Sequence, residues 1–259
     1  MKVTFHKYHG TGNDFIIIDN RSAKINLTHD QVQYLCDRHY GIGADGLMFL
    51  ESHPALAFRM RYYNSDGNES TMCGNGGRCL TAFAKKSDMA SGKVVFDAID
   101  GLHEALINKD DTISLKMTDV KEFKVNNNNY LINTGSPHYV IFENEVNKIN
   151  VFKRGTAIRN SKEFEPYGVN VDFVQFIGND LFVRTFERGV ENETLSCGTG
   201  VTASAISATI NLDTDKNSWD IKTLGGKLNV RFKKSESNKF TDVWLTGPAI
   251  FVFNGEIEI

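Results

Sequence analysis

Several features that identify common classes of protein are missing from this sequence of 259 residues. It contains only four cysteines and no Cys-x-x-Cys pair. A chain of this length does not need disulfides to stabilise its core, so we expect reduced thiols. The spacing of Cys73 and Cys79 does not fit a zinc knuckle or ribbon, and we therefore expect no metal.

The sequence also lacks a large excess of one sign of charge and has no long apolar run. The chain has 29 basic and 32 acidic residues, and the basic ones are scattered, which argues against a nucleic-acid partner. No apolar run approaches the ~18 residues of a membrane span, and the N-terminus lacks the roughly 7 to 15 apolar residues of a signal peptide. We therefore expect a cytoplasmic protein with no membrane partner.

Strands dominate what is present, in a chain whose hydrophobic fraction of 41% allows one large core or two ordinary ones. Apolar and polar residues alternate along 58–62, 113–117 and 228–232. Gly225-Gly226 is typical of a hairpin turn, and "AIFVFNGEIEI" predicts two short strands around Asn254-Gly255. Successive strands without intervening helices favour antiparallel sheets and an α+β fold class.

Three helices are predicted. The first runs from Asp30 to about Tyr40, with Thr28 as its cap and Gly41 at its end. The second follows Cys73 and has one apolar face. That face comprises Gly76, Cys79, Leu80, Phe83 and Ala84. The third follows Cys197 and is small or apolar on almost every side, as a helix enclosed by a sheet would be.

The last two helices begin with the same pattern, Cys-Gly-x-Gly, at Cys73 and Cys197. This repeat suggests two similar halves with a boundary near "TDVKEFKVNNNN". Asn126 to Asn129 fit a loop between strands better than a long linker.

A thiol at a helix start can become nucleophilic or basic. The unpaired N-H groups and the partial positive charge there favour a thiolate and can bind a carboxylate, whereas burial raises the pKa of a thiol. Glycines let a ligand approach the N-H groups of 74–77 and 198–200. If both helix starts faced one α-carbon from opposite sides, one sulfur could remove its proton and the other return one, which is the geometry of a racemase.

Each candidate also has a plainer interpretation. Cys36 and Cys79 are expected to be packing residues, and Cys73 and Cys197 taken singly could be small buried apolar groups. His138 could be a hydrogen-bonded histidine at a strand start, or a group that orients or receives a proton from a thiol.

Two further motifs have a plainer interpretation. Glu187 and Arg188 could be a solvated pair, or could supply polar groups to the site of the second cysteine. "GIGADG", 41–46, follows a helix and precedes a strand, which is the wrong order for a dinucleotide site.

Taken together, these segments resemble the diaminopimelate epimerase family of cofactor-independent amino acid racemases and epimerases. The resemblance covers nearly the whole chain. The matching segments are "KYHGTGNDFIIID", "RHYGIGADGL", "YYNSDGNESTMCGNGGRC", "TGSPHYVIF", "YGVNVDFVQ" and "FERGVENETLSCGTG".

The resemblance implies a fold of two pseudo-symmetric domains, each a mainly antiparallel, strand-rich sheet around a central helix. The first would span 1–118 and be joined by a C-terminal strand, 248–259, and the second would span 119–247. It also implies a homodimer that uses neither pyridoxal phosphate nor metal. The reaction would be inversion of LL-diaminopimelate to the meso isomer, on the route to lysine and peptidoglycan.

The resemblance also implies roles for individual residues. Cys73 and Cys197 would be the acid and base, supported by His138 and Glu187. The implied substrate-binding residues are Asn13, Asn64, Gly74, Asn75, Asn170, Glu187, Arg188, Gly198 and Thr199.

Some positions depart from the family pattern. Ser136 replaces a frequent asparagine, Gly46 replaces an occasional glutamine, and the stretch from Glu187 to Cys197 is one residue longer. Two alternative functions remain open on the sequence. One is a proline racemase-like enzyme of the same fold, against which Asn75 argues, and the other is a non-catalytic amino-acid-binding or thiol redox protein.

Overall fold

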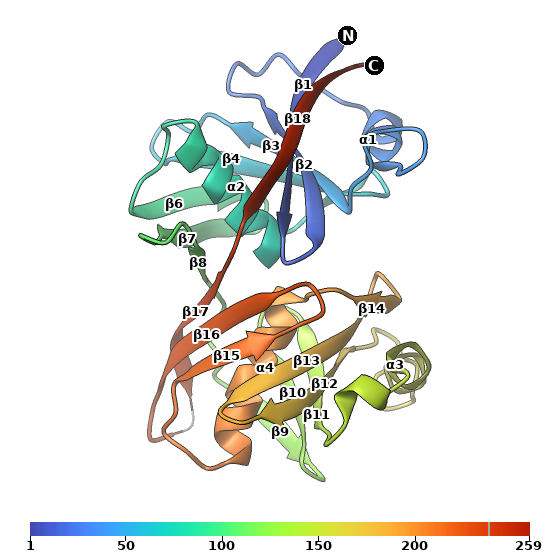
Figure 1. Cartoon of the computed structure of the whole chain (residues 1–259), viewed down its shortest axis with the longest axis vertical. Helices are drawn as coiled ribbons and strands as arrows, with labels where there is room; N and C mark the ends of the chain where they lie inside the picture. Colours follow the sequence, from blue (N-terminus) through green and yellow to red (C-terminus); the bar gives the residue numbers. More distant parts are fainter. Residues whose placement is uncertain (238) are drawn as a thin grey trace. The chain divides into compact units, whose positions relative to one another are not determined.

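The computed structural model describes residues 1–237 and 239–259. The chain divides into two compact units (Figure 1). Unit 1 comprises Met1–Leu115 and Gly247–Ile259, and unit 2 comprises Lys116–Thr246. The last strand of the chain therefore belongs to unit 1.

Unit 1 is built from strands with two helices between them. The helices are α1 (His29–Cys36) and α2 (Gly74–Lys86). The strands are β1 (Lys2–Gly10), β2 (Asn13–Asp19), β3 (Gly46–Glu51), β4 (Phe58–Asn64), β5 (Glu69–Ser70), β6 (Lys93–Ala98), β7 (Gly101–Ile107), β8 (Ile113–Lys116) and β18 (Ile250–Glu258). They pair in the order β18-β1-β2-β3-β4-β6-β7-β8, and the short β5 also pairs with β4. Only the β2–β3 and β4–β6 pairs are parallel.

Unit 2 repeats this plan. Its helices are α3 (Val151–Arg159), α4 (Gly198–Asn211) and the short η1 (Val146–Lys148). Its strands are β9 (Phe123–Asn126), β10 (Asn129–Asn133), β11 (Pro137–Phe142), β12 (Asn170–Ile177), β13 (Asp180–Glu187), β14 (Asn192–Thr194), β15 (Ser218–Lys222), β16 (Lys227–Lys234) and β17 (Phe240–Gly247). They pair in the order β9-β10-β11-β12-β13-β15-β16-β17, with β14 also on β13. The parallel pairs, β11–β12 and β13–β15, stand at the same two places as in unit 1, so the duplication inferred from the two cysteine motifs is confirmed.

Each unit encloses one helix. α2 packs against β1, β2, β3 and β7, and α4 packs against β10 to β13, β15 and β16. The predicted apolar face of α2 is buried throughout, and α4 is buried on nearly every side from Gly198 to Thr209. The prediction of strand-rich sheets around internal helices is therefore confirmed for both units.

Several local predictions are also confirmed. Gly225 and Gly226 lie in the hairpin turn between β15 and β16. Asn127 and Asn128, with φ of 48° and 60°, form the two-residue turn between β9 and β10. Asparagine tolerates this left-handed conformation and is favoured in such hairpin turns. The middle two of the four asparagines are thus a loop between strands, whereas Asn126 ends β9 and Asn129 begins β10.

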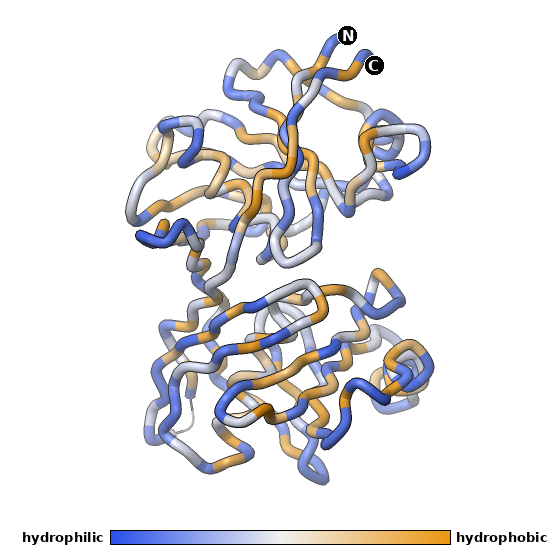
Figure 2. The backbone as a smooth tube through the Cα atoms, in the orientation of Figure 1, coloured by the Kyte–Doolittle hydropathy of each residue, from blue (hydrophilic) through white to orange (hydrophobic). Residues whose placement is uncertain are grey.

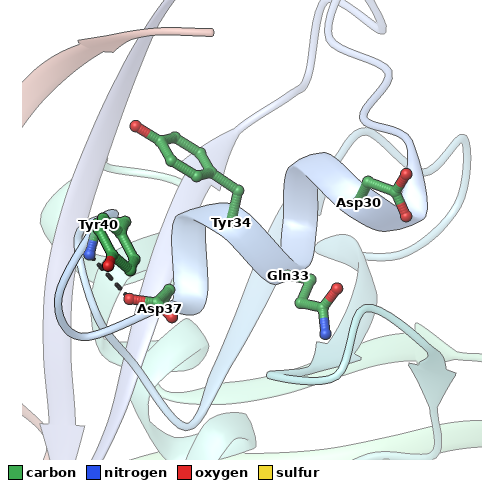
Figure 3. A pocket seen from close by; sticks show the side chains of 5 residues that line it. All are labelled: Asp30, Gln33, Tyr34, Asp37 and Tyr40. Atoms are coloured by element: carbon green, nitrogen blue, oxygen red, sulfur yellow. Dashed lines mark hydrogen bonds between the residues drawn. The ribbon is translucent and has the colours of Figure 1, made fainter.

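The end of the first helix was predicted wrongly. Thr28 caps α1 as expected, but the helix stops at Cys36 rather than near Tyr40. The side chain of Asp37 accepts hydrogen bonds from the backbone N-H group of His39 and from that of Tyr40 (Figure 3). This turn competes with further helical bonds, as aspartate side chains commonly do.

The C-terminal segment was also predicted wrongly as two short strands. It is one strand, β18, paired with β1 along its length. A bulge at Val252, between the partners of Lys7 and Tyr8, shifts the register of the two strands by one residue. Asn254-Gly255 is not a turn because Gly255 lies opposite Phe5, whose ring occupies the space that a side chain would need.

Hydrophobic and hydrophilic residues alternate along the strands of both units, and hydrophilic residues gather in the connecting turns (Figure 2). This is the pattern of sheets with one buried face. Within the two described ranges, no helix has the length and apolar character needed to cross a membrane.

Gly155 on α3 offers a test of this packing, because a Cβ there would lie 2.4 Å from both Cβ and Cγ of Phe186. Alanine gains about 1 kcal/mol of helix propensity over glycine, but overpacking costs about 1–3 kcal/mol. We expect Gly155→Ala to lower the free energy of unfolding by about 1–2 kcal/mol, measured by urea denaturation. The exposed Lys153→Ala on the same helix should change it by less than about 0.5 kcal/mol. Unchanged or increased stability of Gly155→Ala would contradict the packing described.

Candidate functional site

The first predicted thiol lies where expected in unit 1. Cys73 is the N-cap of α2, in an extended conformation, and its carbonyl accepts the first helical hydrogen bond, from Gly77 at 2.7 Å. The N-H groups before that bond point out of the helix end. Cys73 is half-buried, whereas Cys79 and Cys36 are buried in the core as predicted.

Asn13 and Asn75 lie beside Cys73. The Oδ1 atom of Asn13 accepts a hydrogen bond from Nδ2 of Asn75 at 3.1 Å and lies 3.6 Å from Sγ of Cys73. A two-residue turn places Asn13 there, because Thr11 and Gly12 both have positive φ and connect β1 to β2. Three of the predicted residues thus meet at the start of α2.

Arg78 belongs to the same group and was not predicted. Its side chain is fully buried and donates to Oδ1 of Asn75 at 2.9 Å and to the carbonyl of Gly74 at 3.2 Å. Burial lowers the pKa of Arg78. An arginine among the buried residues of an otherwise small and apolar helix was the signal that could have identified it.

A network of charged groups supports Asn13 from behind. Nδ2 of Asn13 donates to Asp45 at 2.6 Å, and Arg38 bridges Asp45 and Asp14, each at 2.7 Å. Lys7 pairs with Asp14 at 2.8 Å. The Asp45 contact orients the amide of Asn13 so that its oxygen faces Cys73.

Two other positions in unit 1 bear on the predicted site. Asn64 ends β4 opposite Gly46 and is exposed. A Cβ on Gly46 would lie 2.6 Å from the ring of Tyr62 and from the carbonyl of Tyr63. A glutamine at this position would therefore be incompatible with Tyr62 as it is placed here.

Unit 2 presents the second thiol in the same way. Cys197 is the N-cap of α4, and its carbonyl accepts from Val201 at 3.0 Å. Gly198 and Thr199 form the first turn. Cys197 is only 6% exposed, so this sulfur is more deeply placed than that of Cys73.

His138 is close to this thiol but contacts it through Thr199. The Thr199 hydroxyl lies 2.8 Å from Nε2 of His138 and 3.4 Å from Sγ of Cys197. The carbonyl of Thr199 accepts from the Thr134 hydroxyl at 2.8 Å, which anchors the start of α4 to the turn before β11. His138 is fully buried at the beginning of β11.

Asn170 and Arg188 share a neighbour in Ser136. Nδ2 of Asn170 donates to the Ser136 hydroxyl at 2.8 Å, and Nη2 of Arg188 lies 3.5 Å from it. Oδ1 of Asn170 accepts from the backbone N-H of Arg188 at 2.8 Å. Nη1 of Arg188 donates to the carbonyl of Tyr167. The serine that replaces the frequent asparagine thus links two predicted substrate-binding residues.

Glu187 ends β13, and its carboxyl lies near Thr194 and Cys197. Burial raises the pKa of Glu187. Burial also raises the pKa of Cys197 well above its ordinary value, and the negative charges of Glu187 and Asp172 raise it further. The tight turn after β13 contains the exposed Val190 and Glu191, so the longer stretch before Cys197 passes through a surface loop while Glu187 still reaches the thiol.

Both units draw their residues from equivalent places. In unit 1, the β1–β2 hairpin supplies Asn13 at the start of β2. In unit 2, the β10–β11 hairpin supplies Ser136 in its turn and His138 near the start of β11. The start of the next strand, which is parallel, supplies Asp45 just before β3 in unit 1 and Asn170 on β12 in unit 2. The end of the following strand supplies Asn64 on β4 in unit 1 and Glu187 on β13 in unit 2. The enclosed helix supplies the thiol. Each unit therefore forms one half-site of the same design.

A hollow beside α1 does not take part. It is lined by Asp30, Gln33, Tyr34, Asp37 and Tyr40 (Figure 3). None of these is a predicted site residue.

Comparison with known proteins agrees with the site. The diaminopimelate epimerase family model matches residues 5–122 and 130–252. A diaminopimelate epimerase of Flavobacterium psychrophilum is 50% identical over 254 residues, covering 97% of this chain and 99% of that protein. That of Chlorobaculum tepidum is 40% identical over 264 residues, covering 96% and 99%.

Solved structures show the same fold at low sequence identity. A phenazine biosynthesis protein of the PhzF family from Bacillus anthracis superposes with a TM-score of 0.80 at 15% identity, covering 100% of both chains. A hydroxyproline epimerase from Agrobacterium vitis superposes with a TM-score of 0.70 at 14% identity, covering 99% of this chain and 92% of that one.

The duplicated fold and its two thiol-capped helices, taken with the full-length matches, define an isomerase. The chain belongs to the diaminopimelate epimerase family. The proline racemase-like alternative is therefore not supported at the level of the family.

The ion pairs behind Asn13 give a pH-dependent test. Burial would raise the pKa of Asp14, but hydrogen bonds from Arg38 and Lys7 outweigh it and lower that pKa from 3.8 to about 2. A depressed carboxyl pKa stabilises the fold above the unfolded value and ceases to do so as the pH falls through the folded value. We expect Asp14→Asn to cost about 2 kcal/mol at pH 7, a loss that shrinks between about pH 4 and pH 2. Urea denaturation at several pH values measures it.

The control is Glu256→Gln, which removes an exposed ion pair with Lys2. It should change the free energy of unfolding by less than about 0.5 kcal/mol at every pH. If the loss in Asp14→Asn were the same at pH 7 and pH 3, packing rather than charge would account for it.

Proposed function

We propose that this protein inverts one α-carbon of diaminopimelate and interconverts the LL and meso isomers, with neither pyridoxal phosphate nor metal. The observation that carries the proposal is the Cys-Gly-x-Gly helix start found once in each unit of a chain of this family. In this reaction Cys73 and Cys197 would act from opposite faces of the α-carbon. One sulfur would remove the proton while the other supplied one.

The protonation states follow from the surroundings of Cys197. Its raised pKa favours the thiol, so Cys197 would be the proton donor in the resting protein and Cys73 the base. After one turnover the roles would be reversed, and the opposite isomer would react. Glu187 and His138 would be the polar groups that accompany the change of charge at Cys197.

Substrate binding would use the backbone N-H groups and the polar side chains that are present at the half-sites. The backbone N-H groups of Gly74, Gly198 and Thr199 would hold the carboxylate at the reacting centre, where charge develops. Side-chain amides can meet both an ammonium and a carboxylate. The remaining proposed binding residues are Asn13, Asn64, Asn75, Asn170, Glu187 and Arg188.

The setting of the reaction is also part of the proposal. The product would enter lysine and peptidoglycan precursor synthesis, and the reducing cytoplasm would keep both thiols reduced. Residues 1–118 with 248–259, and residues 119–247, would be two domains. We propose further that two chains form a homodimer, supported by the exposed apolar side chains of Ile250, Val252 and Phe253 on β18.

Replacement of either thiol tests the chemistry. We expect Cys73→Ser and Cys197→Ser each to lower kcat by about 10²- to 10⁴-fold, because a serine hydroxyl is a far weaker acid than a thiol and forms almost no anion to act as the base near neutral pH. Cys36→Ala removes a buried thiol outside the half-sites and should leave kcat unchanged. Turnover is followed by conversion of LL- to meso-diaminopimelate.

Isotope exchange separates this proposal from its rivals. Incubation with diaminopimelate in deuterated water should place deuterium at the α-carbon, and no label there would exclude an epimerase. Faster inversion of proline than of diaminopimelate would favour a racemase of the other type. A Cys73–Cys197 disulfide that forms under reducing conditions, without inversion, would indicate a redox protein.

The homodimer is tested by sedimentation equilibrium. We expect a mass of twice 29.0 kDa for the parent and a shift towards the monomer in Val252→Lys, since a charge there would oppose apolar association. A control at an exposed residue of α3, Lys153→Glu, should remain dimeric. A monomeric parent would disprove this part of the proposal.

A further inference from the structure

Asp172 is a fully buried carboxylate beside the Cys197 half-site that no prediction included. Oδ2 lies 2.7 Å from Nδ1 of His138, and Oδ1 accepts the Thr185 hydroxyl at 2.6 Å. Oδ1 also lies only 2.4 Å from where a Cβ on Gly200 would be, so the carboxylate sits against the first turn of α4. A helix N-terminus favours an anion. An ionised carboxylate only accepts hydrogen bonds, so Nδ1 of His138 carries a hydrogen.

The other ring nitrogen of His138, Nε2, lies 2.8 Å from the Thr199 hydroxyl. Nδ2 of Asn170 is also near it, at 3.4 Å, but its two hydrogens are directed to the Ser136 hydroxyl and the Pro137 carbonyl. In a neutral ring, the hydrogen that Asp172 holds on Nδ1 leaves a lone pair on Nε2, which is the Nδ1-H tautomer.

This tautomer fixes the direction of the next hydrogen bond. With Nε2 as acceptor, the Thr199 hydroxyl donates to it at 2.8 Å, and the Thr199 oxygen is available to accept from Sγ of Cys197 at 3.4 Å. We infer that Asp172 is a positioning residue of the Cys197 half-site, holding His138 in the Nδ1-H tautomer so that hydrogen bonds run in one direction from Cys197 through Thr199 to His138.

The arrangement accounts for both charge states of the sulfur. When the Cys197 proton passes to the substrate carbon, the S-H electron pair stays on sulfur and a new C-H bond forms. The Thr199 hydroxyl then turns from Nε2 to donate to the thiolate. In the reverse step sulfur regains a proton and the hydroxyl turns back. The other titratable group facing the sulfur is Glu187.

The tautomer can be measured without substrate, so the test does not depend on the proposed function. Long-range ¹H–¹⁵N NMR of ¹⁵N-histidine-labelled protein distinguishes Nδ1-H, Nε2-H and the imidazolium, and the signal of His138 is identified by its loss in His138→Gln. We expect Nδ1-H in the parent. An Nε2-H ring or an imidazolium at pH 7.5 would overturn the inference.

Substitution of Asp172 tests its role. In Asp172→Asn the amide oxygen should stay at the α4 N-terminus, which repels an NH₂ group, leaving NH₂ against Nδ1 and forcing the Nε2-H tautomer. The kinetic arm rests on the proposed function: kcat for diaminopimelate inversion should fall by about 10- to 100-fold while KM changes little. An unchanged tautomer together with an unchanged kcat would overturn the inference.

Thr199 provides a second variant should Asp172→Asn fail to fold. Thr199→Val should keep the Nδ1-H tautomer but lower kcat, because the link to the sulfur is broken. Thr202→Val is the matched control, since Thr202 is a buried threonine of the same helix whose hydroxyl donates to the carbonyl of Gly198. It should keep both tautomer and kcat. Equal kcat values for the two variants would overturn the series of hydrogen bonds through Thr199. A parent protein that shows the expected tautomer but does not invert diaminopimelate would count against the proposed function alone.

Discussion

Each unit depends on one constraint, which is that a helix beginning at a cysteine must fit inside the unit's own sheet. The glycines of the repeated motif are needed for this packing. A Cβ on Gly76 would lie 3.1 Å from the sulfur of Met48. At Gly200 the clash with Asp172 would be at 2.4 Å. The motif was interpreted as giving a ligand access to backbone N-H groups, but the same glycines also let the helix approach its strands, so helix packing sets the position of each thiol.

The duplicated plan does not give the two thiols the same surroundings. Around Cys73 the neighbours are amides, Asn13 and Asn75, with the buried guanidinium of Arg78 behind them. Around Cys197 they are a hydroxyl and two acids, Glu187 and Asp172. Carboxylates oppose negative charge on a nearby sulfur, and at Cys197 they raise the pKa of the thiol further. The same backbone positions therefore carry side chains of different charge around the two sulfurs.

Much of this fold could be predicted from local patterns, and the errors have identifiable causes. Alternating residues marked β4 and β16, and the small, apolar character of 201–210 marked an enclosed helix. The end of α1 was missed because the side chain of Asp37, and not a glycine, ends it. β18 was divided because Asn-Gly usually signals a turn, while its pairing with β1 links positions about 250 residues apart along the chain. That each unit is a separately folding domain remains a proposal.

The residues of the site could be predicted where a sequence motif is repeated, but not where tertiary contacts alone bring a residue to the site. Cys73 and Cys197 could be found because the motif occurs twice, but Asp172 lies within an apolar strand and Arg78 within an apolar helix, so only the fold shows their contacts. The balance at Cys197 illustrates the same limit. A helix terminus favours a thiolate by about 0.3–1 kcal/mol, less than one pKa unit, whereas full burial can shift a pKa by roughly 3–5 units. Two carboxylates act in the same direction as burial at this sulfur. Burial and charge thus outweigh the helix dipole, and the resting form of Cys197 is the thiol.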